Sequence, residues 1–545
     1  MSKKVLAVIL SLILAFSVVA VPVGAADISF DDINIEDINI ENFNIENFFN
    51  QVIDKLIAFV LTYLNQFWPG YDDQWVGQDE YVPEFFYTGE ETFDAEVADG
   101  AKWKMGYSGA SLLDGIDATS GDYFLAGTLE HIAGRVPVRV IDDQRVRVYA
   151  VSDGVSGVVI QAVIDGFGFS RGDVQIIRER MAAFAEENNV ISVNVSVLHQ
   201  HSCIDTLGMN VPLAQALLFN TGNAAAGGII GDLKVEKNQE FMENLYAKTV
   251  LSMKRAVNAM KPGELSYGSA DIGELIYDKR EPKDFDPNIN RLRFVPDDGT
   301  TEIWVLEAGI HCTMLGAGPD ELTADFPFYV ERKIKMETGA NVVYVQGAEL
   351  AITTDCDTLN LPEDMDGIDR MIAYGEAVAD RVIAIENDVK LDSVLNIKMA
   401  EVRLDVTNEI LTLASREDVL NPVIVRTEDD YQMITEIGYM ELGNEVAIFI
   451  CPGEFDPLLI YGGPESGDAS WSGEEWGYEP LKNFTSCENV MVFGLSNDQA
   501  GYVLRDNEYH SMFTENEEIN VISTSAGSTF VNAFIDLVDS TKAAA

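Results

Sequence analysis

The chain has 545 residues, of which 47% are hydrophobic, so it can form roughly one large domain or two to three ordinary ones and is not a disordered protein. Its 36 basic and 90 acidic residues give a formal net charge of −54, which argues against nucleic acid and anionic membrane surfaces as partners. Five cysteines without a CxxC spacing exclude a disulfide scaffold and a thiolate zinc knuckle.

The first 26 residues predict a secretory signal peptide. Lys3 and Lys4 precede an apolar run over residues 5–23, and small residues ending at Ala25 and Ala26 follow it. A retained membrane anchor is the alternative, but the run is at the short end for a membrane span. We therefore expect an exported, secreted protein.

Residues 27–83 form an acidic leader. A five-residue repeat of the type Asp-Ile-Asn-Ile-Glu comes first, and its period fits neither a helix nor a strand. The segment from Phe48 to Trp68 then has apolar residues at helical spacing, and a Pro-Gly pair ends it. This helix could pack on the main domain, join copies of the chain, or make a peripheral contact with a membrane or cell surface.

Residues 84–530 read as one domain, followed by a short tail over residues 531–545. Helical patterns occur at residues 172–189, 239–261, 328–339 and 368–387. Apolar strand patterns lie between and after them, at residues 145–152, 190–198, 302–310, 341–346, 445–451 and 489–493. This interleaving predicts an α/β fold with a layered mixed β-sheet core flanked by helices. Residues 395–406 and 432–442 alternate more clearly and suggest an antiparallel part.

Polar side chains follow five of the predicted strands, and loops at strand ends are where α/β folds assemble their sites. The strand at 190–198 leads to His199 and His201, which lie two residues apart and should share a face. Other strands lead to His311, Glu349 and Glu454, and the last leads to the polar Gly-rich turn at residues 494–497. The sequence therefore predicts an active site at the strand ends.

A catalytic zinc site needs about three protein ligands and an open position for water. His199, His311 and Glu454 could supply the ligands from three separate strands. The metal would lower the pKa of bound water and polarise a carbonyl group. His201 would be free to transfer a proton.

Several short motifs follow one another along the chain: Lys104-Met-Gly106-Tyr107, Leu198-His-Gln-His-Ser202, Ala308-Gly-Ile-His311-Cys-Thr313 with Thr323-Ala-Asp325-Phe-Pro327, Pro452-Gly-Glu454-Phe455, and Gly494-Leu-Ser-Asn497 with Tyr502. In this order they resemble the motifs of the neutral/alkaline, non-lysosomal ceramidases. The resemblance covers roughly residues 93–525. It implies that family's catalytic domain, without the β-sandwich domain that follows it in longer members.

The resemblance also implies roles for individual residues. His201 would transfer a proton or bind an oxyanion, and Tyr509 would be a further active-site tyrosine. The zinc ligands would be His199, His311, Glu454 and Tyr502. A phenol is an unusual zinc ligand, so Tyr502 could instead form a hydrogen bond to a ligand or to the transition state.

Two stretches depart from the family pattern. Thr353 stands where the family has a serine nucleophile, and Glu349 and Asp355 are carboxylates near it. Attack by the Thr353 hydroxyl and attack by zinc-bound water therefore both stay open. The loop after His201 reads Cys-Ile-Asp-Thr instead of the family's Gly-Pro-Gly-Gly, which leaves the acyl and head-group preference open.

The resulting hypothesis is an exported zinc-dependent amide hydrolase that cleaves the N-acyl bond of ceramide or a related N-acyl lipid. One alternative is a secreted or surface-associated binding protein that keeps the fold without the chemistry. The other is a zinc hydrolase that acts on an acylated amide other than ceramide.

Overall fold

The computed structural model describes residues 75–127, 135–209, 237–315, 320–416, 420–428, 430–463, 474–510 and 518–542. The predicted signal peptide, the five-residue repeat and the helix between Phe48 and Trp68 lie outside these residues. Among the helices that are described, none combines the length and the apolar character that crossing a membrane requires.

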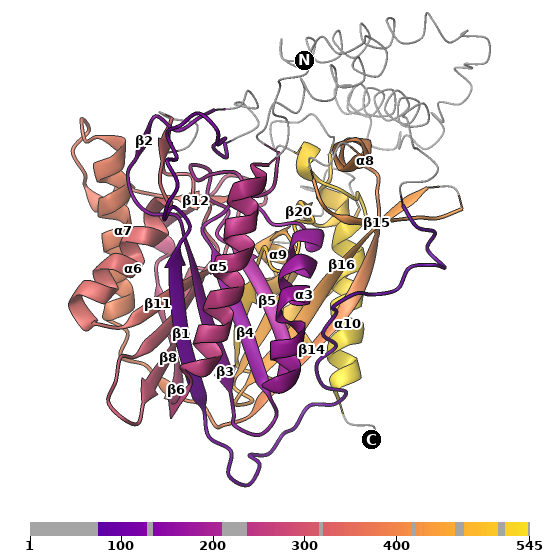
Figure 1. Cartoon of the computed structure of the whole chain (residues 1–545), viewed down its shortest axis with the longest axis horizontal. Helices are drawn as coiled ribbons and strands as arrows, with labels where there is room; N and C mark the ends of the chain where they lie inside the picture. The colour runs from indigo at the N-terminus through magenta and orange to yellow at the C-terminus, as the bar shows by residue number, and fades with distance from the viewer. Residues whose placement is uncertain are drawn as a thin grey trace, which may run out of the picture.

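The described chain contains one large mixed sheet of nine strands (Figure 1). Eight of the strands lie side by side in the order β11-β9-β8-β6-β1-β3-β4-β5. The ninth strand, β13, pairs with β6. The bounds are β1 (Lys104–Ser111), β3 (Arg145–Ser152), β4 (Val158–Ile164), β5 (Val190–Val197), β6 (Lys261–Asp271), β8 (Asn288–Pro296), β9 (Ile303–Ala308), β11 (Asn341–Gln346) and β13 (Val389–Lys390).

Two parallel pairs stand at the opposite edges of this sheet. Helix α3 (Arg171–Glu187) connects β4 to the parallel strand β5, and helix α6 (Asp325–Thr338) lies between the parallel strands β9 and β11. Crossover connections of this kind need a dozen or more residues and commonly use a helix. Within each pair the two strands therefore end on the same side, so the loops that follow them start next to each other.

A second sheet consists, in the described residues, of five strands in the order β14-β16-β17-β19, with β15 paired to β16. The long pair β14–β16 is antiparallel, as the alternating sequence predicts, whereas β17 and β19 are parallel. The bounds are β14 (Leu395–Asp405), β15 (Val423–Arg426), β16 (Tyr431–Leu442), β17 (Val446–Ile450) and β19 (Asn489–Phe493).

The remaining described elements cover the sheets or connect them. They are the helices α5 (Gln239–Asn258), α7 (Gly367–Ile383), α8 (Glu409–Arg416), α9 (Pro457–Tyr461) and α10 (Ala526–Thr541), and the short strands β2 (Arg139–Val140), β7 (Ile276–Asp278), β10 (Glu321–Leu322), β12 (Ile352–Thr354), β18 (Glu454–Phe455) and β20 (Tyr502–Val503).

The elements form layers with helices on the outside (Figure 1). Helices α3 and α5 cover β1, β3, β4 and β5, α6 and α7 lie against β11 and β6, and α10 lies against β14 and β16. Strand β11 also contacts β3, β4 and β5, so the two edges of the large sheet approach each other around a buried core. The predicted α/β fold with a layered mixed sheet is confirmed.

Strand β5 shows how the sequence produces this arrangement. Val193, Val195 and Val197 point to one face and pack in the apolar layer under α3 and α5. Asn194 and Ser196 alternate with them and point to the other face. There the Ser196 hydroxyl lies 2.6 Å from the Ser496 hydroxyl. The polar face of β5 is therefore held by the turn that follows β19.

That turn, residues 494–497, joins three strand ends. The Gly494 N–H donates to the Gln346 carbonyl at the end of β11 over 2.8 Å, and the Asn497 N–H donates to the Val195 carbonyl over 2.7 Å. A Cβ atom at Gly494 would lie 2.4 Å from the Gly347 carbonyl oxygen, so only glycine permits this approach. The turn thus fixes β5, β11 and β19 relative to one another.

Helix α10 extends the domain beyond its predicted end. Its buried residues Phe530, Phe534 and Val538 pack in the apolar layer next to the five-stranded sheet. The predicted domain boundary at residue 530 falls inside this helix, so part of the predicted tail is a core element.

Candidate metal centre

His199 and His201 lie in the loop after β5, which ends at Val197. The backbone of His199 is left-handed, with φ of 54°, so the chain turns here instead of continuing the strand. The two imidazole rings are 4.6 Å apart between centroids and meet at 84°. The sequence predicts that the two rings lie close together. The turn at His199 brings them together, whereas the prediction relied on residues two apart sharing one face of a strand.

Backbone carbonyl groups orient both rings. His199 Nδ1 lies 2.7 Å from the Phe167 carbonyl oxygen, and His201 Nδ1 lies 2.9 Å from the Gly127 carbonyl oxygen. Because a carbonyl oxygen only accepts hydrogen bonds, Nδ1 carries the proton in each ring. In the neutral ring, Nε2 then keeps its lone pair. The Phe167 ring stacks on His199 at 4.5 Å between centroids and restricts its position further.

His311 follows β9 and is oriented in the same way. Its Nδ1 lies 2.9 Å from the Glu349 carbonyl oxygen and 3.1 Å from the Ile352 carbonyl oxygen, and its backbone N–H donates to Ile352 over 2.9 Å. The loop after β11 therefore holds both the backbone and the ring of His311. Its Nε2 atom is left with a lone pair that faces Glu454.

Glu454 follows β17 and begins the short strand β18, which runs parallel to β20. Its backbone N–H donates to the Gly501 carbonyl over 3.0 Å. Its Oε1 atom accepts a hydrogen bond from Gln499 Nε2 over 3.1 Å. These contacts leave Oε2 directed at the histidines.

Three lone pairs converge at this point. Glu454 Oε2 lies 3.1 Å from His311 Nε2 and 3.5 Å from His199 Nε2. Atoms that bind one ion at about 2.1 Å in tetrahedral geometry are roughly 3.4 Å apart. The observed spacing fits that requirement, and the nitrogen and oxygen donors are those that zinc accepts. In the described residues, the ligand atoms of His199, His311, Glu349 and Glu454 all lie within 4.8 Å of one another, and those of the three histidines do so too.

The electrostatics of the cluster favour neutral imidazoles and a bound cation. Burial lowers the pKa of His199 to about 4, against the favourable charge of Glu454, and it lowers the pKa of His201 well below its usual value. Burial raises the pKa of Glu454 and of Glu349. Within the described part of the chain, neither carboxylate forms an ion pair with a lysine or an arginine. A cation bound here would compensate the charge of both carboxylates.

Glu349 belongs to this cluster, although no ligand role is predicted for it from the sequence. It is fully buried, and its Oε2 atom lies 3.6 Å from His311 Nδ1. One signal in the sequence could have identified it: Glu349 follows a buried strand in the same way as His311 and Glu454 do.

The residues around the histidines are held by buried polar contacts. Gln200, between the two histidines, donates through Nε2 to Asp165 Oδ1 at 3.1 Å and to the Ala324 carbonyl oxygen at 2.5 Å. Asp325, in the motif that follows, accepts from the Met314 N–H at 3.0 Å. Because these contacts connect the loops after β5 and β9, the 323–327 motif positions the histidine loops.

The other predicted site residues lie around the loop after β11. Tyr502 is buried and stands beside Glu454 in the β18–β20 pair. Tyr502 and the half-buried Tyr509 share a small apolar cluster with Leu350. Thr353 is half-buried on β12, one residue after the Ile352 carbonyl that holds His311.

All five cysteines are free thiols in the structure. Three of them are neighbours of proposed site residues and are fully buried: Cys203, Cys312 and Cys451. Burial raises the pKa of each of these thiols well above its usual value, which favours the protonated form.

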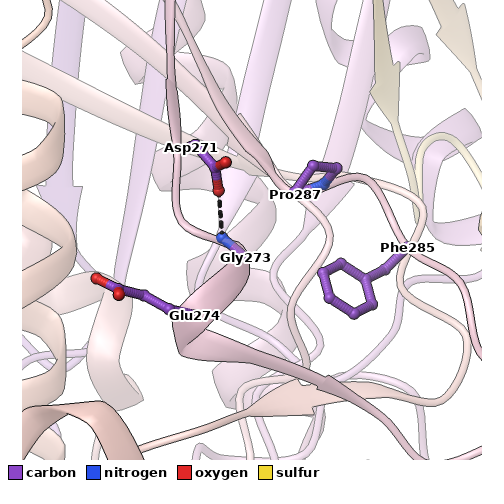
Figure 2. Close-up of a pocket in the computed structure, with 5 residues that line it drawn as sticks. All are labelled: Asp271, Gly273, Glu274, Phe285 and Pro287. Atoms are coloured by element: carbon purple, nitrogen blue, oxygen red, sulfur yellow. Dashed lines mark hydrogen bonds between the residues drawn. The ribbon is translucent and has the colours of Figure 1, made fainter.

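A pocket of about 510 Å³ lies elsewhere (Figure 2). Its lining comes from one stretch of chain that includes the 3-10 helix η3 (Gly273–Leu275): Asp271, Gly273, Glu274, Phe285 and Pro287. Asp271 Oδ1 accepts from the Gly273 N–H over 2.8 Å, so this carboxylate already caps a turn. None of the candidate site residues lines this pocket.

Comparison with known proteins supports the fold. No protein-family model and no curated protein sequence matches the chain. Among solved structures, a neutral ceramidase from Pseudomonas aeruginosa is similar, with a TM-score of 0.61 and 14% sequence identity over 82% of this chain and 77% of that one. A ceramidase complexed with C2 gives a TM-score of 0.58 and 11% identity over 80% of this chain and 75% of that one. The chain therefore has a ceramidase-like fold, and its buried His/Glu cluster could hold a metal ion.

Proposed function

We propose that this chain is a zinc-dependent hydrolase that cleaves the amide bond of a ceramide or a related N-acyl lipid. The observation that carries the proposal is the convergence of His311 Nε2 and His199 Nε2 on Glu454 Oε2, at 3.1 Å and 3.5 Å, inside a buried cluster. The ceramidase-like fold supports the substrate class, since two ceramidases share it.

The metal would be held by His199, His311 and Glu454, with Tyr502 as the fourth ligand. The carbonyl contacts at Nδ1 keep the two imidazoles in the tautomer that can bind a cation through Nε2. A bound zinc ion supplies Lewis-acid activation of a carbonyl group and of water. Buried walls around the site exclude bulk water and strengthen these interactions.

His201 is the proposed proton-transfer residue. Its Nδ1 proton is committed to the Gly127 carbonyl, while its buried Nε2 atom has no hydrogen-bond partner. His201 belongs to the same cluster as the other two histidines. It can therefore accept a proton from the attacking group and return it to the leaving amine.

The attacking group is proposed to be the Thr353 hydroxyl, which stands where the resembling family has its serine. Strand β12 pairs Thr353 with Tyr277 and places it next to the carbonyl that orients His311. Tyr509 would hydrogen-bond the reacting carbonyl or the leaving group. We further propose that residues 1–26 direct export and that the segment from Phe48 to Trp68 contacts the lipid surface from which the substrate is taken.

The test is release of sphingoid base from a ceramide by the purified chain, measured by mass spectrometry with and without a chelator. We expect release that stops when the chelator is added and returns with zinc. His199→Ala and His311→Ala should abolish both bound zinc and release, whereas His131→Ala, at a histidine outside the motifs, should retain them.

Full activity in His199→Ala or in the chelated protein would contradict the proposal. Stoichiometric zinc without release from ceramide or any other N-acyl substrate would favour the binding-protein alternative.

A further inference from the structure

We propose that the carboxylate of Glu349 is an additional ligand of the metal centre, which would then contain two imidazoles and two carboxylates besides the Tyr502 oxygen. The inference rests on the metal centre proposed above. It goes beyond the ligand set implied by the ceramidase resemblance, which assigns no role to this position.

The position of the carboxylate is the first argument. One oxygen of Glu349 lies within 4.8 Å of the ligand atoms of His199, His311 and Glu454, which are mutually within the same distance. Oxygen donors of carboxylates bind divalent metals at about 2.0–2.2 Å, so two donor atoms on one ion lie at most about 4.4 Å apart, which is close to the spacing of this group.

A merely orienting role for this carboxylate does not fit the contacts. His311 Nδ1 already has two carbonyl partners, the backbone oxygens of Glu349 at 2.9 Å and Ile352 at 3.1 Å. The Glu349 carboxylate is 3.6 Å from Nδ1, which is beyond hydrogen-bond distance. The ring of His311 is therefore fixed without it.

The burial of the carboxylate is the third argument. Glu349 is fully buried, and its Oε1 atom has no hydrogen-bond partner, while Oε2 accepts from Gln346 Nε2. A buried carboxylate oxygen without a donor is costly unless a proton or a cation neutralises the group. No lysine or arginine of the described residues forms an ion pair with Glu349.

The loop that carries Glu349 is built tightly, so its position is defined by the backbone. A Cβ atom at Gly309 would lie 1.9 Å from the Ala348 carbonyl oxygen, and Ala351 adopts a left-handed conformation with φ of 65°. The Leu350 N–H donates to the Phe455 carbonyl over 3.2 Å, next to Glu454. The loop is thus locked against both neighbouring ligand loops.

A second carboxylate changes which metals the site prefers. Carboxylates suit harder ions such as Mn²⁺, whereas imidazoles suit Zn²⁺ and its neighbours. The centre should therefore bind Mn²⁺ as well as Zn²⁺, and the Mn²⁺ affinity should depend more on Glu349.

The experiment compares the metal-free full chain with Glu349→Gln, Glu307→Gln and His199→Ala. Glutamine retains the shape of glutamate and can still accept from Gln346. Glu307 is the matched control, because it is an equally buried carboxylate, held by Asn290 Nδ2 at 2.7 Å, that is not part of the cluster. Equilibrium dialysis and elemental analysis give the affinity for Zn²⁺ and Mn²⁺, and the visible spectrum of the Co²⁺-loaded protein reports the ligand shell.

We expect Glu349→Gln to weaken Mn²⁺ binding at least about 10-fold and Zn²⁺ binding less, and to change the Co²⁺ spectrum. Glu307→Gln should behave as the unsubstituted chain. If His199→Ala loses metal while Glu349→Gln matches Glu307→Gln in both affinities and in the spectrum, the inference falls and the proposed function stands. If the unsubstituted chain binds no metal, the proposed centre fails, and the inference fails with it.

Discussion

His311 Nε2 lies 3.1 Å from Glu454 Oε2, although the imidazole proton is committed to Nδ1 on the far side of the ring. Two acceptor atoms at this distance repel each other unless a proton or a metal ion lies between them. The carbonyl groups of Glu349 and Ile352 enforce this arrangement from behind the ring. The backbone of one loop therefore determines what the side chains of three loops can bind.

His201 should be needed for turnover but not for metal binding. We expect His201→Ala to retain one zinc per chain and to lower kcat about 100- to 10,000-fold, because only proton transfer is removed. Metal analysis and steady-state kinetics on the same preparation check this. Loss of zinc in His201→Ala would instead make it a ligand, which the proximity of the three histidines also permits.

Thr353 tests the identity of the attacking group. If its hydroxyl attacks, Thr353→Ala should lower kcat at least about 100-fold, and Thr353→Ser should restore most of it, since serine supplies the same hydroxyl. The neighbouring Thr354→Ala is the control on the same strand. Nearly full activity in Thr353→Ala would show that water attacks directly.

Glu307 should make stability depend on pH. Burial raises its pKa from 4.5 to about 8, with the nearby charge of Asp286 adding to the effect. Between these two pKa values the folded state holds a proton that the unfolded state has lost. The stability associated with the protonated Glu307 carboxyl is therefore fully present below pH 4.5 and is lost as pH rises through 8. Between pH 6 and pH 8 the loss should be roughly 2–3 kcal/mol.

Denaturant unfolding of the unsubstituted chain and of Glu307→Gln at both pH values measures this loss, because glutamine does not titrate. The exposed Glu264→Gln serves as the control. An equal pH dependence in the unsubstituted chain and in Glu307→Gln would show that this carboxyl is not responsible.

Helix α10 should be essential to the domain. Phe534 is fully buried, and its ring lies 5.4 Å from the Phe449 ring of β17 between centroids. We expect Phe534→Ala to reduce the free energy of unfolding by about 3–5 kcal/mol. Asp536→Ala, at an exposed position of the same helix, should change it by less than about 0.5 kcal/mol. Similar unfolding curves for the two variants would contradict a core role of α10.

The sequence predicts the strands that carry the site better than the rest of the fold. β3, β11 and β19 have the predicted bounds, because each is a buried run with clear flanks. β1 and β6 were not predicted, since their glycines, serines and exposed positions weaken the alternation. The burial of the 531–541 part of α10 was missed because no local pattern shows which surface covers the five-stranded sheet.

The site itself is predictable to the level of strand ends and no further. His199, His311 and Glu454 could be selected because each follows an apolar strand. Two features that the strand patterns do not show bring them together. These are the left-handed turn at His199 and the tight packing of the loop around Glu349. Glu349 also follows a buried strand, which is a signal for a site, but no sequence pattern shows that its loop returns to the histidines.

The turn at residues 494–497 has a consequence for how the protein acquires its metal. Its hydrogen bonds to Gln346 and Val195 connect the five-stranded sheet to the nine-stranded sheet, so the metal-binding atoms meet only where the two sheets are docked. Contacts between segments so distant in sequence form late and slowly. In contrast to a zinc finger, where the ion drives folding, metal capture here should be the final step of maturation and should report that the two halves have closed correctly.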